Sequence, residues 1–503
     1  MRAGLTAAGA LLVAACAPTR SLTPGRPTRS GATSGSTPPQ ATAVATEDGT
    51  PKPLPLTTPT ARPVETRAAV AQSSASRATG RTVGALGREY RAYPEVSGTV
   101  QFAHVWDGPR IALVEGWIAD LAAISPSIKV ESDPGDAASA RERLVTALAA
   151  GSPPNAVMLK ADGIAYFADR GALLALEPLL DRDGIADGWF APPERASRSW
   201  DGHLYGLPQT TDGAQHLLFV NLGLLERIGV DPARPIRTWQ DLDALVEPAA
   251  RAGLLVLDPG RIPVGMTAHQ VWTYANGGRY WDEDLRKIGW TEPAGIQAAE
   301  WLLQVVKRQA EEYEQVRSSG DPRAPFSVAE WAADRYVCSI NGAGWFFELQ
   351  QQGQRLRYAA YEIPRNGLNP ASRGETPTTG GWTLAIPKSA RDQEAAWEWL
   401  KLATVSESAC AAAERQRRPS PLAGCDARAN LETAQPFWPA IEASLAKSVA
   451  VPASPMQPQL EQVYRQMQDD VLTARLAPAD ALEVAARDAQ QLLDDWQAKR
   501  KRP

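Results

Sequence analysis

The side chains that most often carry out acid–base or nucleophilic catalysis are sparse and scattered in this sequence. Its 503 residues include only four histidines, and none belongs to an H-E-x-x-H zinc motif. The G-x-S-x-G motif that marks a nucleophilic serine is also missing. Three aspartates, Asp107, Asp162 and Asp212, could still converge as the carboxylate pair of a glycosidase does. We therefore expect no metal and no cofactor, and an exported carbohydrate hydrolase stays open as an alternative to a non-catalytic protein.

A different chemistry, acylation of a thiol, is indicated at Cys16. This cysteine follows the short apolar run Thr6 to Ala15, and Arg2 supplies a positive charge before that run. The order is typical of a bacterial lipoprotein signal, so we predict a signal peptide over residues 1–15 and a lipid on Cys16. The alternative is an unprocessed apolar N-terminus that ends at a cysteine by chance. Since no later stretch has about 20 consecutive apolar residues, we expect a chain anchored to the outer face of the membrane rather than spanning it.

Residues 16–95 are predicted to form a lipidated N-terminus and a disordered tether. They are rich in Thr, Pro and Ser, and all sixteen tryptophans of the chain lie beyond them. A segment of this composition cannot bury enough apolar surface to offset its chain entropy. About 400 residues then remain for a globular part, which is enough for a sizeable core. The net charge of −5 and the lack of a basic stripe argue against a nucleic-acid partner.

The elements that must position any site follow a β-then-α order. Predicted strands over residues 99–106, 128–131 and 156–159 alternate with stretches of helical periodicity. This order is typical of a parallel sheet covered by helices. The same order returns later, with strands predicted over 217–221 and 382–386 and helices after 238, 293, 394 and 458. Two α/β lobes are the simplest architecture for this length.

Three cysteines remain after Cys16. Cys338 lies in an apolar, strand-like run and is expected to be a buried free thiol. Cys410 and Cys425 flank a polar loop, and a disulfide between them would persist outside the cell. The sequence leaves open whether this pair is bonded, because spacing alone does not place two thiols within bonding distance.

Several segments together resemble one family. Residues 205–245 read YGLPQTTDGAQHLLFVNLGLLERIGVDPARPIRTWQDLDAL, residues 337–345 read VCSINGAGW, and residues 380–389 and 394–402 read GGWTLAIPKS and EAAWEWLKL. Their order and spacing are similar to those of the extracellular solute-binding proteins of bacterial ABC importers, in the carbohydrate class typified by maltose-binding protein. The resemblance extends from about residue 96 to about residue 496.

This resemblance implies an α/β, two-lobed fold of the type II periplasmic-binding-protein kind. It places residues 96–213 with 360–403 in lobe 1 and residues 214–359 with 404–503 in lobe 2. It also implies a monomer that captures a sugar or oligosaccharide between closing lobes and delivers it to a membrane permease. The acidic candidates leave a cationic, non-sugar solute open as an alternative.

A sugar site needs aromatic rings for the C–H faces and fixed polar groups for the hydroxyls. The resemblance and this chemistry together predict ten ligand-binding residues: Trp106, Asp107, Asp162, Gln209, Thr211, Asp212, Trp272, Trp345, Gly381 and Trp382. Trp345 is expected on an exposed turn, since glycines stand at positions 342 and 344. The alternatives are a packed Trp106 with a capping Asp107, an N-cap role for Asp162, and a core position for Trp272. Arg417 and Arg418 are expected in a solvated basic loop.

Overall fold

A computed structural model describes residues 81–190, 198–211, 216–261, 266–282, 284–319, 327–351 and 356–500. The predicted signal peptide, Cys16 and the tether up to residue 80 lie outside these ranges, and so does Asp212. The sequence predicts disorder up to residue 95, but the structure has an antiparallel hairpin of β1 (Arg81–Ala85) and β2 (Arg88–Ala92) in this stretch. Two tyrosines explain the difference, because Tyr90 and Tyr93 are buried.

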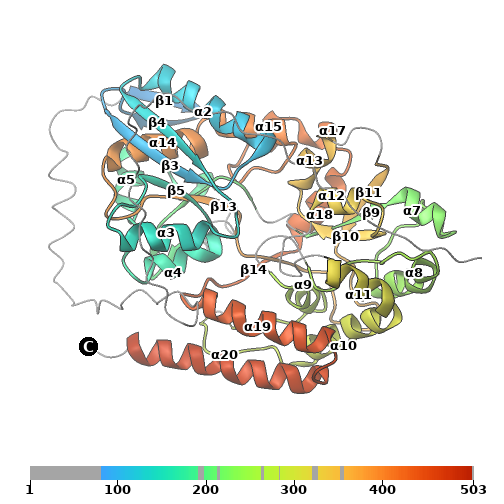
Figure 1. The fold of residues 1–503 in the computed structure, drawn as a ribbon. Coiled ribbons are helices and arrows are strands. Elements are labelled where there is room, and N and C mark those ends of the chain that lie inside the picture. Colours follow the sequence, from blue (N-terminus) through green and yellow to red (C-terminus); the bar gives the residue numbers. More distant parts are fainter. Residues whose placement is uncertain are drawn as a thin grey trace, which may run out of the picture. The chain divides into compact units, whose positions relative to one another are not determined.

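Lobe 1 is built on a five-stranded sheet with the order β4-β3-β5-β13-β8 (Figure 1). The strands are β3 (Gly98–His104), β4 (Ile128–Pro134), β5 (Ala156–Lys160), β8 (Leu207–Pro208) and β13 (Trp382–Ala385). The central strand β3 runs parallel to β4 and β5, whereas β13 is antiparallel to β5 and β8. The predicted strands over 99–106, 128–131 and 156–159 are therefore confirmed.

Helices cover this sheet and complete the core of lobe 1. They are η1 (Gly108–Arg110), α2 (Ile111–Ile124), α3 (Ala140–Ala149), η2 (Ala161–Gly163), α4 (Ile164–Ala168), α5 (Glu177–Asp183), η3 (Asp187–Trp189), α14 (Gln393–Val405), α15 (Glu407–Gln416) and α16 (Cys425–Arg428). An aromatic cluster joins the sheet to α2 and α14, since Trp399 lies 5.1 Å from Phe102 and 6.2 Å from Trp117 between ring centroids. A small hairpin of β6 (Ser199–Trp200) and β7 (His203–Leu204) precedes β8.

Lobe 2 has a three-stranded antiparallel sheet with the order β10-β9-β11, formed by β9 (Leu217–Asn221), β10 (Cys338–Asn341) and β11 (Tyr358–Glu362). Its helices are α7 (Leu222–Arg227), α8 (Trp239–Arg251), α9 (Ala268–Ala275), α10 (Pro293–Arg308), α11 (Ala310–Ser319), α12 (Val328–Ala332), α13 (Trp345–Gln351), α18 (Trp438–Ala446), α19 (Gln457–Leu472) and α20 (Pro478–Arg500). The last two helices lie side by side (Figure 1). A capping box of Thr238 and Asp241 begins α8, as its sequence indicates. None of the helices in the described ranges is long and apolar enough to cross a membrane.

Two segments lie in the other lobe from the one that the sequence predicts. Residues 358–362 were expected largely in lobe 1, yet β11 pairs with β9 of lobe 2. Residues after 404 were expected in lobe 2, yet α15 and α16 pack in the core of lobe 1 through Cys410, Leu422 and Cys425. A short parallel pair joins β12 (Thr376–Thr378) to β14 (Ser448–Ala450). Strand β12 directly precedes β13 in the chain. These pairings join segments that are far apart in the chain, so local periodicity cannot predict them.

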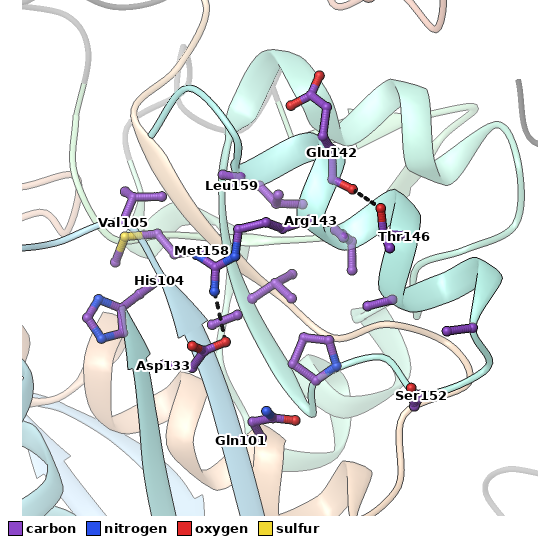
Figure 2. A pocket seen from close by; sticks show the side chains of 17 residues that line it. Gln101, His104, Val105, Asp133, Glu142, Arg143, Thr146, Ser152, Met158 and Leu159 are labelled. Atoms are coloured by element: carbon purple, nitrogen blue, oxygen red, sulfur yellow. Dashed lines mark hydrogen bonds and ion pairs between the residues drawn. The ribbon is translucent and has the colours of Figure 1, made fainter. Parts of the chain in front are cut away.

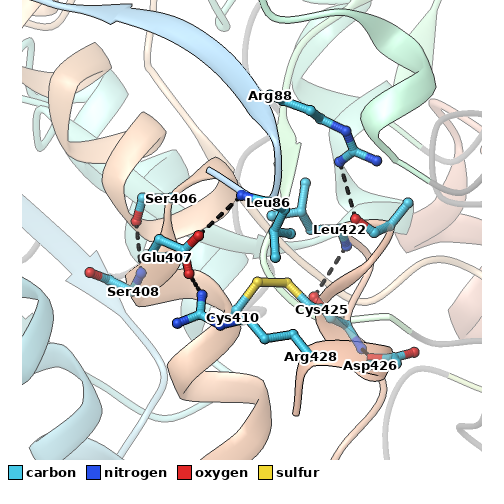
Figure 3. Close-up of a disulfide and its surroundings, with 12 residues drawn as sticks. Leu86, Arg88, Ser406, Glu407, Ser408, Cys410, Leu422, Cys425, Asp426 and Arg428 are labelled. Carbon is cyan, nitrogen blue, oxygen red and sulfur yellow. Dashed lines mark hydrogen bonds and ion pairs between the residues drawn. A yellow bond between two sulfur atoms is a disulfide. The ribbon is translucent and has the colours of Figure 1, made fainter. Parts of the chain in front are cut away.

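The loop between α15 and α16 is closed by a disulfide between Cys410 and Cys425 (Figure 3). The β1–β2 hairpin packs beside it, because the Leu86 amide donates to Glu407 Oε1 at 3.0 Å and Arg88 Nη1 donates to the Ala423 carbonyl at 3.1 Å. The third cysteine, Cys338, is a buried free thiol on β10, as predicted.

Candidate ligand-binding site

The polar run Gln209–Thr211 follows β8 and is fixed to the first residue of β13. The amides of Gln209 and Thr210 donate to the Trp382 carbonyl at 2.9 and 3.2 Å, and the Trp382 amide donates to Thr210 Oγ1 at 2.8 Å. All three residues of the run are buried. Buried polar groups require such partners, so β13 holds this segment, where the chain leaves lobe 1, in one conformation.

Gly381 allows the close approach of these two segments. A Cβ atom at this position would lie only 1.9 Å from the Thr210 carbonyl oxygen. The Gly381 carbonyl also accepts a hydrogen bond from the Ala161 amide at 3.1 Å. Its role in the structure is thus to bring backbones together, whereas the sequence predicts an approach of backbone to ligand.

Buried polar atoms without partners mark the place where the chain enters lobe 2. Among the described residues, no hydrogen-bond partner reaches Gln209 Oε1, either ring nitrogen of His216, or Asn341 Nδ2. Asn341 is paired with Leu217 across β9 and β10, and Leu217 directly follows His216 in the chain. An unpaired buried group costs about 1–3 kcal/mol, and a bound molecule with hydroxyl groups removes that cost.

The imidazole of His216 is held neutral. Its pKa is lowered to about 3, first by burial and then by the positive charge of Lys160, against a smaller opposing effect of the Pro377 carbonyl. That carbonyl does not meet the ring in hydrogen-bonding geometry. A neutral imidazole offers one donor and one acceptor, which suits an uncharged hydroxyl better than an ion.

Of the four predicted tryptophans, only Trp382 keeps a partly exposed side chain. Its ring lies 5.8 Å from Lys160 Nζ, on the neighbouring strand β5. Trp106 packs against Trp117 at 5.2 Å, and Trp272 is fully buried on α9, as its core alternative proposes.

The prediction of an exposed turn for Trp345 is wrong. This tryptophan begins α13, is 5% exposed, and packs against Phe219 and Trp331 at 5.4 and 5.6 Å between ring centroids. The glycines do form a turn, but burying a large aromatic ring against other rings is more favourable than leaving it in water.

Asp107 and Asp162 follow the carboxyl ends of the neighbouring parallel strands β3 and β5. Asp107 is exposed and makes no side-chain cap bond to η1. Asp162 lies within η2, and the N-cap residue of α4 is Gly163, so the N-cap alternative for Asp162 is wrong. Carboxyl ends of parallel strands are where open α/β sheets bind ligands.

Two residues of this site, His216 and Asn341, are missing from the sequence-based set. A signal for both is present in the sequence, since His216 directly precedes the mainly apolar run of β9 and Asn341 is the last residue of β10, and both strands are wholly buried. Within the described ranges, no group of three or more His, Cys, Asp or Glu side chains is arranged to hold a metal ion.

Two cavities are lined by other residues. One of about 490 Å³ in lobe 1 is lined by His104, Asp133 and Arg143 among others, and Figure 2 shows the Arg143–Asp133 ion pair at its wall. Another of about 800 Å³ in lobe 2 lies beside Trp301 and Leu368. None of the predicted ligand-binding residues lines either cavity.

Comparison with known proteins agrees with this architecture. The model of the family described as bacterial extracellular solute-binding protein matches residues 112–409. Among solved structures, a solute-binding protein of an ABC transporter from Thermotoga lettingae, bound with alpha-D-tagatose, is 22% identical with a TM-score of 0.67, and the match covers 79% of this chain and 100% of that one.

Two further structures are similar over the same part of the chain. An ABC substrate-binding protein from Listeria monocytogenes in complex with cycloalternan is 16% identical with a TM-score of 0.68, covering 79% of this chain and 99% of its own. The maltose/maltodextrin-binding domain from Bdellovibrio bacteriovorus, bound to maltotriose, is 16% identical with a TM-score of 0.65, covering 79% and 100%. At these identities the likeness concerns the fold.

Proposed function

Because this chain belongs to the bacterial extracellular solute-binding proteins and has the two-lobed type II fold that its sequence predicts, we propose that it captures a sugar or oligosaccharide between its lobes. It then delivers the ligand, chemically unchanged, to the permease of an ABC importer. The similar structures named above were solved with tagatose, cycloalternan and maltotriose. The observation that carries the proposal is that buried polar atoms of Gln209, His216 and Asn341 find no hydrogen-bond partner among the described residues.

The chemistry of a sugar fits these atoms. A hydroxyl group donates to Gln209 Oε1, accepts from Asn341 Nδ2, and exchanges one hydrogen bond with the neutral His216 ring. The partly exposed ring of Trp382 supplies an apolar surface for the C–H face of the sugar. Asp107, Asp162, Thr211 and Asp212 are further proposed contacts.

We also infer that the protein works as a monomer at the membrane surface. The lipoprotein signal that the sequence predicts over residues 1–15, with a lipid on Cys16 and a tether after it, supports this location. A tether of this kind keeps the loaded protein at a high effective concentration near its permease.

Calorimetric titration of the purified protein with tagatose, maltotriose and cycloalternan tests the proposal. We expect saturable binding of at least one of them, with the sugar recovered intact. Trp382→Ala should weaken binding about 10- to 100-fold, because each 1.4 kcal/mol of lost contact is tenfold in affinity. Trp438→Ala, which removes another partly exposed tryptophan, on α18, is the matched control and should leave affinity unchanged.

Two results would overturn the proposal. Release of smaller sugars during incubation would move the protein to the hydrolases, with Asp107 and Asp162 as the first carboxylates to test. Tighter binding of a cationic solute than of any sugar would replace the carbohydrate with a charged ligand.

A further inference from the structure

Arg418 lies where three parts of the chain meet. It belongs to the loop between α15 and α16 and is only 7% exposed, so the prediction of a solvated basic loop is wrong for this residue. Its Nη2 donates to the Thr211 carbonyl at 2.9 Å, at the end of the polar run that leaves lobe 1. Its Nη1 lies 3.4 Å from the position that a Cβ of Gly344 would take.

A second arginine of lobe 1 reaches the same glycine. Arg110, at the end of η1, donates from Nη2 to the Gly344 carbonyl at 3.1 Å and pairs through Nη1 with Glu348 on α13 at 2.8 Å. Gly344 stands three residues after Asn341, whose side-chain amide is one of the unpaired buried groups. Arg110 thus holds the turn that follows β10, and the Arg418 guanidinium lies beside this turn.

Backbone and side-chain hydrogen bonds hold the loop that carries Arg418, together with the disulfide. The Arg418 amide donates to the Ala413 carbonyl at 3.1 Å, and the Arg417 carbonyl accepts from Gln435 Nε2 at 3.0 Å. Further along, the Ser420 amide donates to Asp426 Oδ1 at 2.8 Å. The Cys410–Cys425 disulfide closes this loop across a separation of 15 residues (Figure 3).

We propose that Arg418 is a positioning residue of the ligand site and that the Cys410–Cys425 disulfide keeps it in place. Arg418 fixes the Thr211 carbonyl, and through it the conformation of Gln209–Thr211. A guanidinium suits this task because its planar, rigid fork of donors loses little freedom when it binds a carbonyl. In this proposal the disulfide acts on the ligand site through this arginine. The proposal rests on the proposed function for its ligand, but its geometry does not depend on which sugar is bound.

A thermodynamic cycle separates this role from simple stabilisation. The four proteins are the wild type, Arg418→Gln, the double variant Cys410→Ser with Cys425→Ser, and all three changes together. With maltotriose as the probe, we expect Arg418→Gln and the double serine variant each to weaken binding about tenfold. The triple variant should bind no more weakly than Arg418→Gln, since the effects of coupled sites are not additive. The serine changes should lower the melting temperature equally with and without Arg418, because the cross-link acts mainly on the unfolded chain.

A second readout needs no ligand. Hydrogen exchange of the amides of residues 207–211 in the ligand-free protein should become faster in Arg418→Gln and in the serine variant, with no further increase in the triple variant. Arg418→Lys should keep only part of the protection from exchange, because a lysine ammonium lacks the planar, forked donors of a guanidinium. Arg88→Gln is the matched control, since Arg88 also contacts the disulfide loop but not Thr211; it should change neither affinity nor exchange.

The outcomes are distinct. Additive losses of affinity, or unchanged exchange at residues 207–211 in Arg418→Gln, would overturn the positioning role. If no variant and no wild-type protein binds maltotriose or another sugar, while the exchange pattern follows the expectation, the positioning role stands and the proposed sugar function fails.

Discussion

Trp345 and Trp382 both stand beside glycines, but their rings have different environments. Trp345 packs in a cluster with Phe219 and Trp331, whereas Trp382 keeps part of its ring exposed beside Lys160. Residue type and neighbouring glycines are the same for both, so the sequence could not separate a core ring from a ligand-facing one. Burial in the folded chain separates them, because Trp345 is 5% exposed and Trp382 is partly exposed.

At this scale we predict that Trp345→Ala lowers the free energy of unfolding by about 3–5 kcal/mol, the usual cost of removing a buried tryptophan. Urea unfolding followed by circular dichroism measures the change. Trp438→Ala removes a partly exposed tryptophan from the edge of the same cluster and should cost clearly less. Equal costs for the two variants would show that Trp345 is not a core residue.

Helices α9 and α10 are joined by a histidine that burial keeps neutral. His269 on α9 is 1% exposed, its Nδ1 lies 2.5 Å from the Tyr280 hydroxyl, and its Nε2 lies 2.9 Å from the Gly295 carbonyl on α10. Burial lowers its pKa to about 4, against a smaller opposing effect of the Gly295 carbonyl. Since the ordinary pKa of histidine is about 6.5, the unfolded chain binds a proton between pH 6.5 and 4 that the folded protein does not.

We therefore expect His269 to reduce stability as the pH falls from 6.5 to 4, by about 1.4 kcal/mol for each pH unit. His269→Gln removes this contribution, so its free energy of unfolding should depend less steeply on pH in that window. His203→Gln, at an exposed position, is the control and should keep the slope of the wild type. Parallel curves for His269→Gln and the wild type would contradict the assignment.

Elements with regular local patterns were predictable from the sequence, and pairings between distant segments were not. The strands β3, β4, β5 and β9 follow from their apolar runs, and α8 follows from its capping box. The change of lobe after β12 depends on β11 pairing with β9 and on α15 packing in lobe 1. Those contacts join residues far apart in the chain, so local periodicity and turn signals carry no information about them.

On the scale of the whole described unit, α20 connects the lobes on a surface away from Arg418. Its first turns are buried with lobe 2 through residues such as Leu482. Its last turns reach lobe 1, where Trp496 Nε1 donates to Asp169 Oδ2 at 3.2 Å and Arg500 pairs with Asp201 at 2.8 Å. Trp496 also lies 5.6 Å from Trp200 of the β6–β7 hairpin.

We predict that Trp496→Ala with Arg500→Gln makes this arrangement of the lobes less populated in the ligand-free protein. Each lost contact is worth about 1 kcal/mol, enough to shift a balanced equilibrium several-fold. Small-angle X-ray scattering should then record a changed radius of gyration without ligand and a smaller change with saturating ligand. Arg487→Gln, on an exposed face of α20, is the control and should scatter like the wild type.

The β1–β2 hairpin has a mechanical consequence for a chain held by its N-terminus. Arg81 pairs with Ala92, so the strand that the tether enters and the strand that continues into lobe 1 have their ends side by side. A pull on the predicted tether acts first on the Arg81–Ala92 pair and then on each of the other pairs in turn. The five pairs of this hairpin are therefore not loaded all at once. Strand β1 can therefore open pair by pair while β2, whose Tyr90 and Ala92 pack in the core of lobe 1, stays in place. A pull on the proposed lipid anchor would therefore lengthen the chain first at this hairpin and leave the candidate ligand site unstrained.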